Sequence, residues 1–313
     1  RQLIEKNNIN LPFVGDVGAF RIYDDDVEDR LPENILYKKV NDEIKYPICF
    51  KNSSTNAYEF DFAGSRIGSE FILIGGPCSA ESDEQIFKAA KYISSLKMKF
   101  FRAGCFKPRT NAYSFQGLER YGLELCRRAC DQYDLKFVTE VKDLSNLDDV
   151  YEYADVIQVG SKCMYDVGVL RELGKAKKPI LLKRHFGATL IEYAQAADFV
   201  ASHGNSSITL CERGIRTFET STRFSLDSSG IEWMKKHVDL PIIGDPSHAM
   251  GFSYGVEGLS LSMMAQGVRG LIIEVHPNPS QAKSDSSQQL NFDEFKKVKS
   301  KIEKFRNLLE NVL

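Results

Sequence analysis

The sequence contains no long apolar run, no excess of charge of one sign, and a single tryptophan among its 313 residues. A membrane-spanning helix needs about 20 consecutive apolar residues, and no run approaches that length, so we expect no membrane association. The formal net charge is −2, so the broad basic surface of a nucleic-acid-binding protein is not expected. No positively charged and then apolar leader opens the chain, so we expect no signal peptide in it.

A disulfide framework is also missing. The seven cysteines are odd in number and lack framework spacing, which is typical of reduced thiols and predicts a cytoplasmic protein. The apolar fraction of 42% is ordinary for a globular protein, and the length allows one large domain or two smaller ones.

From residue 71 onward one pattern repeats eight times: a short apolar run, a polar or glycine-containing stretch, and a segment with helical periodicity. The apolar runs are FILIGG (71–76), KFFRAG (99–104), KFVTEV (136–141), VIQVG (156–160), PILLKR (179–184), SITLCE (207–212), PIIGDP (241–246) and GLIIEVH (270–276). The clearest helical segments are 83–97, 118–134, 190–204, 230–238 and 292–313. Short apolar runs are typical of strands buried on both faces, and their alternation with helices indicates parallel βαβ units.

Eight such units predict a (β/α)8 TIM barrel, a fold of about 250 residues. A doubly wound open sheet is the alternative, and it is disfavoured because no GxGxxG follows the first strand. Residues 1–65 differ in composition and are interpreted as an N-terminal extension, with the barrel at 66–313. The extension is expected to hold one helix near its start and a few strands, at 19–23, 46–50 and 58–62, that would close the bottom of the barrel.

In a TIM barrel the active site lies at the C-terminal ends of the strands. Polar side chains, most of them charged, follow all eight predicted strands, whereas the opposite ends carry little beyond Lys or Pro. In strand order these residues are Cys78; Arg102, Lys107 and Arg109; Glu140; Lys162; Lys183 and Arg184; Arg213 and Arg216; Asp245 and His248; and Glu274, His276 and Asp285.

Lysines and arginines gathered at one mouth repel one another unless anions neutralise them. They therefore predict a substrate set with several anionic groups, expected to be two phosphates and a carboxylate. The Cys, His, Glu and Asp residues after the first, seventh and eighth strands are a candidate divalent-metal site with mixed S, N and O ligands. A buried structural role for Cys78 and a loop-fixing role for His276 are equally open at this point.

Eight motifs occur in order at successive strand ends: GPCSAES, FRAGCFKPRTNAYSFQG, VTEV, LLKR, LCERGIRTFE, DPSHAMG, IEVHPNP and KSDSSQ. Over about residues 66–295 they resemble the 3-deoxy-D-arabino-heptulosonate 7-phosphate (DAHP) synthases, in the type I branch related to 3-deoxy-octulosonate 8-phosphate synthases. The resemblance implies a metal-dependent, aldol-type condensation of phosphoenolpyruvate with erythrose 4-phosphate and water, the first step of the shikimate pathway. It also implies one divalent ion (Mn, Fe, Co or Zn) and a homo-oligomer, a dimer or a tetramer.

The resemblance also implies roles for individual residues. The implied metal ligands are Cys78, His248, Glu274 and Asp285. The implied substrate-binding residues are Arg102, Lys107, Lys162, Lys183 and Arg213, together with Arg109 and Thr110 of the KPRT motif for the erythrose phosphate. Glu140 is implied to lie near the attacking water, which makes Lys107, Glu140 and His248 the expected catalytic residues.

Three segments depart from the family pattern. A GAR-type motif with an arginine is usual after the fourth strand, but the chain has GSKCM, and Lys162 keeps the charge without the bidentate geometry. His185 and Phe186 after LLKR, and GFSYGVEG after His248, are also unusual. These departures leave open the same chemistry on a different aldose, and a non-catalytic barrel that acts as a binding partner.

Overall fold

The computed structural model describes residues 45–46, 48–51, 58–107, 111 and 113–312. The strand expected at 19–23 and the helix expected near the N-terminus lie outside these residues, as do Arg109 and Thr110.

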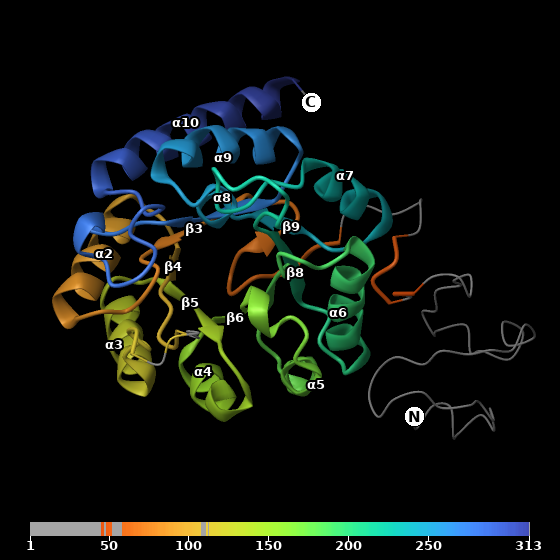
Figure 1. Ribbon diagram of the computed structural model, residues 1–313, viewed down its shortest axis with the longest axis horizontal. Helices are drawn as coiled ribbons and strands as arrows, with labels where there is room; N and C mark the ends of the chain where they lie inside the picture. The colour runs from red at the N-terminus through yellow and green to blue at the C-terminus, as the bar shows by residue number, and fades with distance from the viewer. Residues whose placement is uncertain (1–44, 47, 52–57, 108–110, 112, 313) are drawn as a thin grey trace, which may run out of the picture.

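Eight parallel strands close into a barrel, in chain order from β3 to β10, with β10 paired to β3. Figure 1 shows the strands surrounded by helices. The strands are β3 (Ile72–Gly76), β4 (Phe100–Arg102), β5 (Lys136–Val141), β6 (Val156–Val159), β7 (Ile180–Lys183), β8 (Ile208–Glu212), β9 (Ile242–Gly244) and β10 (Gly270–Glu274). All eight fall within the predicted apolar runs, so the (β/α)8 barrel is confirmed.

Helices follow the strands and pack one apolar face against them. They are α2 (Asp83–Ser95), α3 (Glu119–Gln132), α4 (Leu147–Tyr153), α5 (Val167–Lys175), α6 (Leu190–Ser202), α7 (Ser228–His237), α8 (Pro246–Met250), α9 (Val256–Ala265) and α10 (Phe292–Val312), with 3₁₀ turns η2 (Leu144–Asn146), η3 (Ser161–Cys163), η4 (Ser253–Gly255) and η5 (Pro279–Gln281). Local signals set several helix starts, as at α6, where Thr189 and Glu192 form a reciprocal capping box. No helix in the described part of the chain is both long and apolar enough to cross a membrane.

A short antiparallel sheet from the N-terminal extension covers the N-terminal end of the barrel. It consists of β1 (Phe60–Asp61) and β2 (Arg66–Ile67), and its apolar residues join the cluster inside the barrel. The ring of Phe62 lies 5.3 Å from that of Phe100 on β4. This hairpin spans residues 65 and 66, and the domain boundary placed there stays a prediction.

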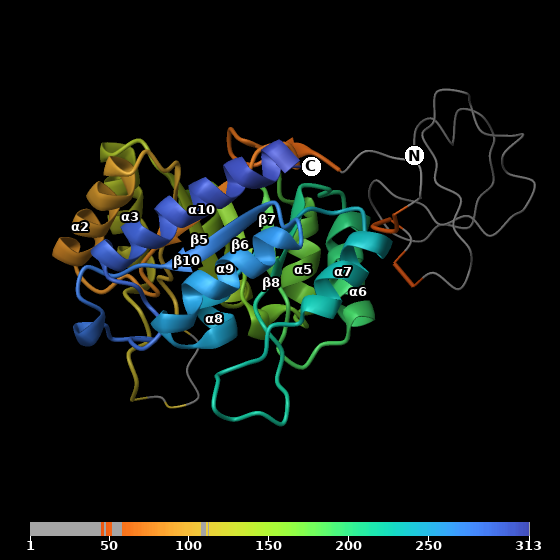
Figure 2. The same ribbon diagram turned by 90° about the horizontal axis from the view of Figure 1, so that it is seen from above.

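The opposite, C-terminal end carries the long loops. Figure 2 shows the loop after β8 projecting from this end of the barrel, away from the β1–β2 hairpin. Because the strands are parallel, Arg102, Lys183, Glu212 and Glu274 all end strands at this face. The fold therefore brings chemically distinct side chains from distant parts of the sequence to one place.

Candidate active site

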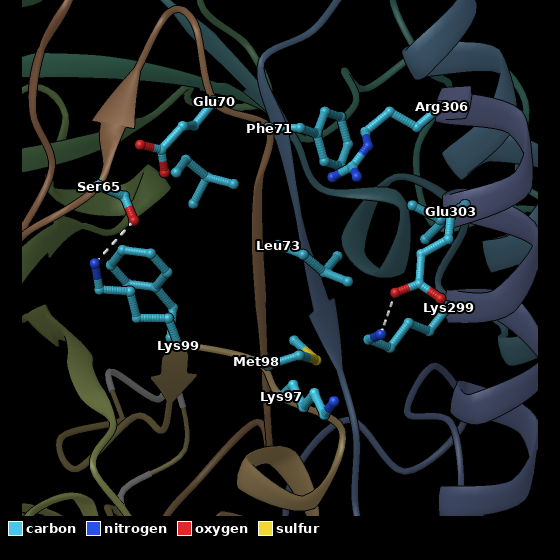
Figure 3. Close-up of a pocket in the computed structure, with 13 residues that line it drawn as sticks. Ser65, Glu70, Phe71, Leu73, Lys97, Met98, Lys99, Lys299, Glu303 and Arg306 are labelled. Carbon is cyan, nitrogen blue, oxygen red and sulfur yellow. Dashed lines mark hydrogen bonds and ion pairs between the residues drawn. The ribbon is translucent and has the colours of Figure 1, made fainter. Parts of the chain in front are cut away.

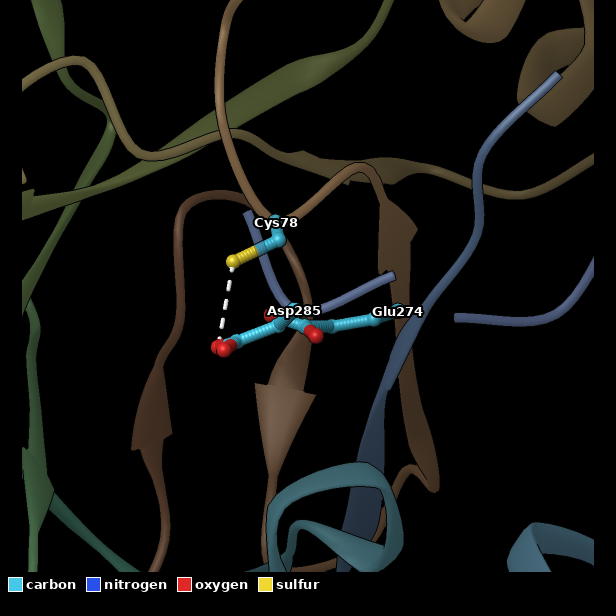
Figure 4. Close-up of side chains that lie close together, drawn as sticks. All are labelled: Cys78, Glu274 and Asp285. Carbon is cyan, nitrogen blue, oxygen red and sulfur yellow. Dashed lines mark hydrogen bonds between the residues drawn. The ribbon is translucent and has the colours of Figure 1, made fainter. Parts of the chain in front are cut away.

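Three of the expected metal ligands form a compact cluster (Figure 4). The Cys78 sulfur and one carboxylate oxygen from each of Glu274 and Asp285 all lie within 4.8 Å of one another. Cys78 lies in the turn after β3, Glu274 at the end of β10, and Asp285 in the loop that follows β10. The Cys78 Sγ lies 3.5 Å from Asp285 Oδ2. The residues meet because β3 and β10 are paired neighbours, so the end of one strand faces the turn after the other.

The fourth expected ligand, His248, lies beside this cluster on the short helix α8. Its Nε2 lies 3.6 Å from Glu274 Oε1 and 4.0 Å from Asp285 Oδ2. Asp245 caps this helix through the His248 backbone N–H and also contacts the His248 Nδ1 at 2.7 Å. Lys183 donates a 2.5 Å hydrogen bond to Asp245 Oδ2, the oxygen that contacts the His248 Nδ1. Asp245 therefore fixes the imidazole with Nε2 directed at the two carboxylates.

Burial and charge set the protonation of these donors. Burial raises the pKa of the Cys78 thiol to about 12, and the Glu274 carboxylate adds to the shift. Burial lowers the pKa of His248, which favours the neutral imidazole that metals bind. Burial by itself would raise the pKa of the Asp285 carboxyl. The positive charges of His248, which is protonated in the acid range where Asp285 titrates, and of Arg223 instead hold that pKa well below its usual value.

This donor set fits a divalent cation. Two carboxylates and a neutral imidazole already face one another, and a cation between them would supply the positive charge that a buried thiol needs to ionise. Mixed S, N and O donors suit Mn, Fe, Co or Zn rather than the all-oxygen sites of Mg or Ca.

Several of the lysines and arginines at this end of the barrel form hydrogen bonds or ion pairs within the protein itself. Arg102 donates to Glu274 Oε1 at 2.6 Å and to the Pro77 carbonyl at 3.1 Å. Lys107 donates to the Cys78 carbonyl oxygen at 2.9 Å and to its Sγ at 3.1 Å. Arg184 is buried in ion pairs with Glu212 and Asp227. Carboxylates of the protein therefore neutralise part of the positive charge that the sequence-based prediction had paired with substrate anions.

Arg213, directly after β8, differs from these paired cations. It is buried, and its Nε and Nη1 have no hydrogen-bond partner among the residues that the structure describes. Its guanidinium carbon lies 4.1 Å from the centre of the Phe224 ring. Burial lowers the pKa of Arg213 to about 10, so it remains charged at neutral pH. A buried charged donor without an acceptor is unfavourable, and an anion would satisfy it.

Glu140 and Lys162 lie on neighbouring parts of the mouth. The Glu140 carboxylate, near the end of β5, accepts a 3.0 Å hydrogen bond from Gln158 of β6. It also lies directly over Gly160, where an added Cβ would stand 1.9 Å from Glu140 Oε1. Lys162 is exposed on η3.

The sequence-based prediction of the site did not include the side chains that contact the expected metal ligands. Gln289 accepts a 2.9 Å hydrogen bond from the Cys78 backbone N–H, and Ser284 Oγ lies 2.8 Å from Cys78 Sγ. Gln288 and Arg223 contact the carboxylate ligands. Ser284 and Gln288 stand in the KSDSSQ motif, but amides and hydroxyls are common in loops and carry no chemical signature by type or spacing.

A pocket of about 200 Å³ lies at the other end of the barrel and contains none of the expected site residues. Figure 3 shows Phe71 and Leu73 on one side of it and Lys299, Glu303 and Arg306 of α10 on the other. This pocket is therefore separate from the candidate active site.

Comparisons with known proteins show the family of the chain. Residues 36–311 match the model of the DAHP synthetase I family. The chain is 43% identical over 250 residues to the phospho-2-dehydro-3-deoxyheptonate aldolase of Thermotoga maritima, covering 80% of this chain and 74% of that protein. It is also 29% identical to the 2-dehydro-3-deoxyphosphooctonate aldolase of Francisella tularensis subsp. holarctica, over 78% of this chain and 94% of that one.

A solved structure is similar over nearly the whole length. The crystal structure of the Thermotoga maritima phospho-2-dehydro-3-deoxyheptonate aldolase (DAHP synthase) superimposes with a TM-score of 0.83 at 36% identity, covering 98% of this chain and 92% of that one. The fold, the family match and the identity agree, and the resemblance seen in the motifs is confirmed. The chain therefore belongs to the DAHP synthetase I family, and it is an enzyme that catalyses the aldol-type condensation of that family.

Proposed function

We propose that the enzyme condenses phosphoenolpyruvate with erythrose 4-phosphate and water to give 3-deoxy-D-arabino-heptulosonate 7-phosphate and phosphate, with one bound divalent metal ion. The observation that carries this proposal is the pair of features at one barrel mouth. A cluster of sulfur and carboxylate donors, with His248 next to it, shares the C-terminal face of the barrel with Arg213, whose Nε and Nη1 have no hydrogen-bond partner among the described residues. The product would feed the shikimate pathway.

Cys78, His248, Glu274 and Asp285 would hold the metal. A bound divalent ion supplies Lewis-acid polarisation of a carbonyl oxygen, here the aldehyde of the aldose. The proposal draws support from the proximity of the four donors and from the burial of Cys78 and Glu274.

The cations would bind and orient the two anionic substrates. Arg213, Lys183, Arg102 and Lys107 are proposed for phosphoenolpyruvate, because all four stand at strand ends, or in the loops directly after them, on the C-terminal face. Lys162 is proposed as an additional phosphate contact. For erythrose 4-phosphate, Arg109 and Thr110 are proposed on the KPRT motif alone.

The bond changes follow from the substrates. C3 of phosphoenolpyruvate forms a bond to the aldehyde carbon, water adds at C2, and cleavage of the C2–O bond releases phosphate. Lys107, Glu140 and His248 are the proposed catalytic residues, which would position the water and handle its protons. Glu140 is suited to this role because Gln158 fixes its carboxylate at the mouth.

The experiment is an assay of the purified enzyme with each metal and both substrates, following phosphate release and the colour reaction of the 3-deoxy-ulosonate. Cys78→Ala is expected to lose both metal and activity. Cys130→Ala, a buried cysteine on α3 outside the cluster, is the matched control and is expected to retain both. Absence of product with every metal would refute the proposal, and full activity in Cys78→Ala would remove Cys78 from the site.

A second candidate keeps the chemistry but changes the aldose. Lys162, in place of a family arginine, favours it, as do the relatives named as octonate aldolases. A panel of aldose phosphates and unphosphorylated sugars separates the two, and a clear preference for erythrose 4-phosphate rejects the second.

We also propose a homo-oligomer, a dimer or a tetramer, on the family resemblance alone. Light scattering coupled to size-exclusion chromatography measures it. The cytoplasm is the proposed compartment because the seven cysteines are odd in number and lack the spacing of a disulfide framework.

A further inference from the structure

The loop between β8 and α7 reaches back to the proposed metal ligands through Arg223. Figure 2 shows this loop projecting from the C-terminal face. The Arg223 Nη1 lies 3.2 Å from Asp285 Oδ2 and donates a 2.5 Å hydrogen bond to Gln288 Oε1. One guanidinium nitrogen therefore contacts a ligand carboxylate and the side chain of a loop residue three positions further on.

Gln288 continues this contact to the second carboxylate. Its side chain is 1% exposed, and its Nε2 donates a 2.5 Å hydrogen bond to Glu274 Oε2. An amide has one acceptor oxygen and one donor nitrogen, so a cation on one side and a carboxylate on the other admit one orientation of the group. The other Glu274 oxygen accepts from Arg102. Both oxygens of this ligand are thus held by named donors.

The backbone around Arg223 is also fixed. Ile215 and Ser225 pair across the loop through two 2.9 Å backbone hydrogen bonds. The Arg223 backbone N–H donates to the Met250 carbonyl, two residues beyond His248. At the next residue, Gly251, φ is +79°, and an added Cβ would stand 2.3 Å from the Arg223 Cβ. The glycine thus permits both the left-handed turn and the close approach of Arg223.

We propose that Arg223 and Gln288 are positioning residues that hold the carboxylates of Asp285 and Glu274 in the orientation needed for metal binding. The proposal rests on the metal site proposed above and extends it to two side chains that do not coordinate the ion. Partners of this kind restrict the orientation of a ligand before the metal arrives, which lowers the cost of ordering it on binding. Arg223 additionally offsets the repulsion between the neighbouring carboxylates of Asp285 and Glu274.

The test is a titration of the metal-free, full-length chain with Co²⁺, read by the thiolate-to-cobalt charge-transfer absorption that Cys78 would produce. Arg223→Met and Gln288→Met keep an unbranched side chain but remove the polar contacts. Both are expected to raise the Kd for Co²⁺ about 10- to 100-fold, the usual effect of losing an outer partner of a metal ligand. Arg223→Lys keeps the positive charge but not the forked guanidinium group. Its Kd for Co²⁺ should therefore lie between those of wild type and Arg223→Met.

Arg128→Gln and Gln266→Met are the matched controls. Arg128 pairs with Asp83 on the outer helices, and Gln266 donates to the Ser228 carbonyl, so both lose a polar contact away from the cluster. Their Kd should equal that of wild type. Circular dichroism establishes folding, and Arg223→Met is measured first because Arg223 is partly exposed.

Two outcomes separate the two proposals. A wild-type Kd in both Arg223→Met and Gln288→Met overturns the positioning role while the metal site stands. A wild-type protein without the charge-transfer band overturns the site itself, and the positioning role with it.

Discussion

Arg102 and Glu274 form a buried ion pair across the first strand of the barrel. They end β4 and β10, the two neighbours of β3, and Arg102 Nη1 lies 2.6 Å from Glu274 Oε1. The side chains are 3% and 1% exposed. The pair thus lies beside Cys78 and links the proposed anion-binding and metal-binding halves of the site.

Removal of one partner should therefore strongly destabilise the protein. Arg102→Met leaves the Glu274 charge buried without its main cation, and we expect a loss of about 3–5 kcal/mol in the free energy of unfolding. The double variant Arg102→Met, Glu274→Leu should recover most of this loss, because two apolar residues leave no charge unpaired. Urea denaturation measures stability, and both variants should be inactive. Equal stability of the single and double variants would contradict this account.

Gly160→Ala should separate activity from stability. The Gly160 backbone is in an ordinary extended conformation, but its new Cβ would meet the end of the Glu140 side chain at 1.9 Å. The flexible carboxylate should move, and a displacement of about 1 Å predicts a fall in kcat/KM of about 100-fold with little change in Tm.

The matched control is Gly258→Ala in α9, where nothing lies within 4 Å of the new methyl group. It should raise stability by about 0.5–1 kcal/mol and leave kcat/KM unchanged. Wild-type activity in Gly160→Ala would show that Glu140 tolerates displacement and is not catalytic.

Glu81 should contribute stability that depends on pH. Its carboxylate accepts from Ser79 Oγ and from the Lys283 backbone N–H, both at 2.9 Å, and lies 3.5 Å from His276 Nε2. Burial raises the pKa of Glu81, but the adjacent His276 imidazole and the hydrogen bonds from Ser79 and Lys283 together lower it below its usual value. Stability from a lowered pKa is present above the unfolded pKa, about 4.3, and is lost as pH falls through the folded one.

Glu81→Gln should accordingly be less stable than wild type at pH 7, by about 1–2 kcal/mol, and the difference should shrink below about pH 4. Denaturation curves from pH 3 to pH 7 measure it. Glu84→Gln, at an exposed position of α2, should follow the wild-type curve throughout. A constant gap between Glu81→Gln and wild type at all pH values would argue against ionisation as the cause.

Lys162→Arg should improve substrate binding if this side chain contacts a phosphate. We expect the KM for phosphoenolpyruvate to fall about two- to fivefold in Lys162→Arg and to rise by a similar factor in Lys162→Met, since exposed ion pairs contribute about 0.2–1 kcal/mol. Lys175, exposed on α5 and paired with Glu172, provides the control with the same two substitutions. Identical KM values in all four variants would remove Lys162 from the substrate set.

The sequence predicted the barrel because each strand is short and apolar, each helix has a 3.6-residue period, and the two alternate eight times. It also placed Cys78, His248, Glu274 and Asp285 at one face, because parallel strands share a C-terminal end. The strand predicted at 46–50 was wrong in extent: Phe50 forms an isolated bridge with Val238 instead. Such short pairings depend on the partner surface rather than on local composition.

The sequence by itself determined the fold, the face that carries the chemistry and the kinds of side chain at that face, since all three follow from local periodicity and strand direction. Only the tertiary structure decided which charges neutralise one another. Arg102, Lys183 and Arg184 pair with carboxylates at the ends of other strands or directly after them. Arg213 has no such partner among the described residues, and Arg223 contacts Asp285 and Gln288 from a separate loop. These pairings require distances of about 3 Å between residues up to 172 positions apart, and only strand register and barrel closure set such distances.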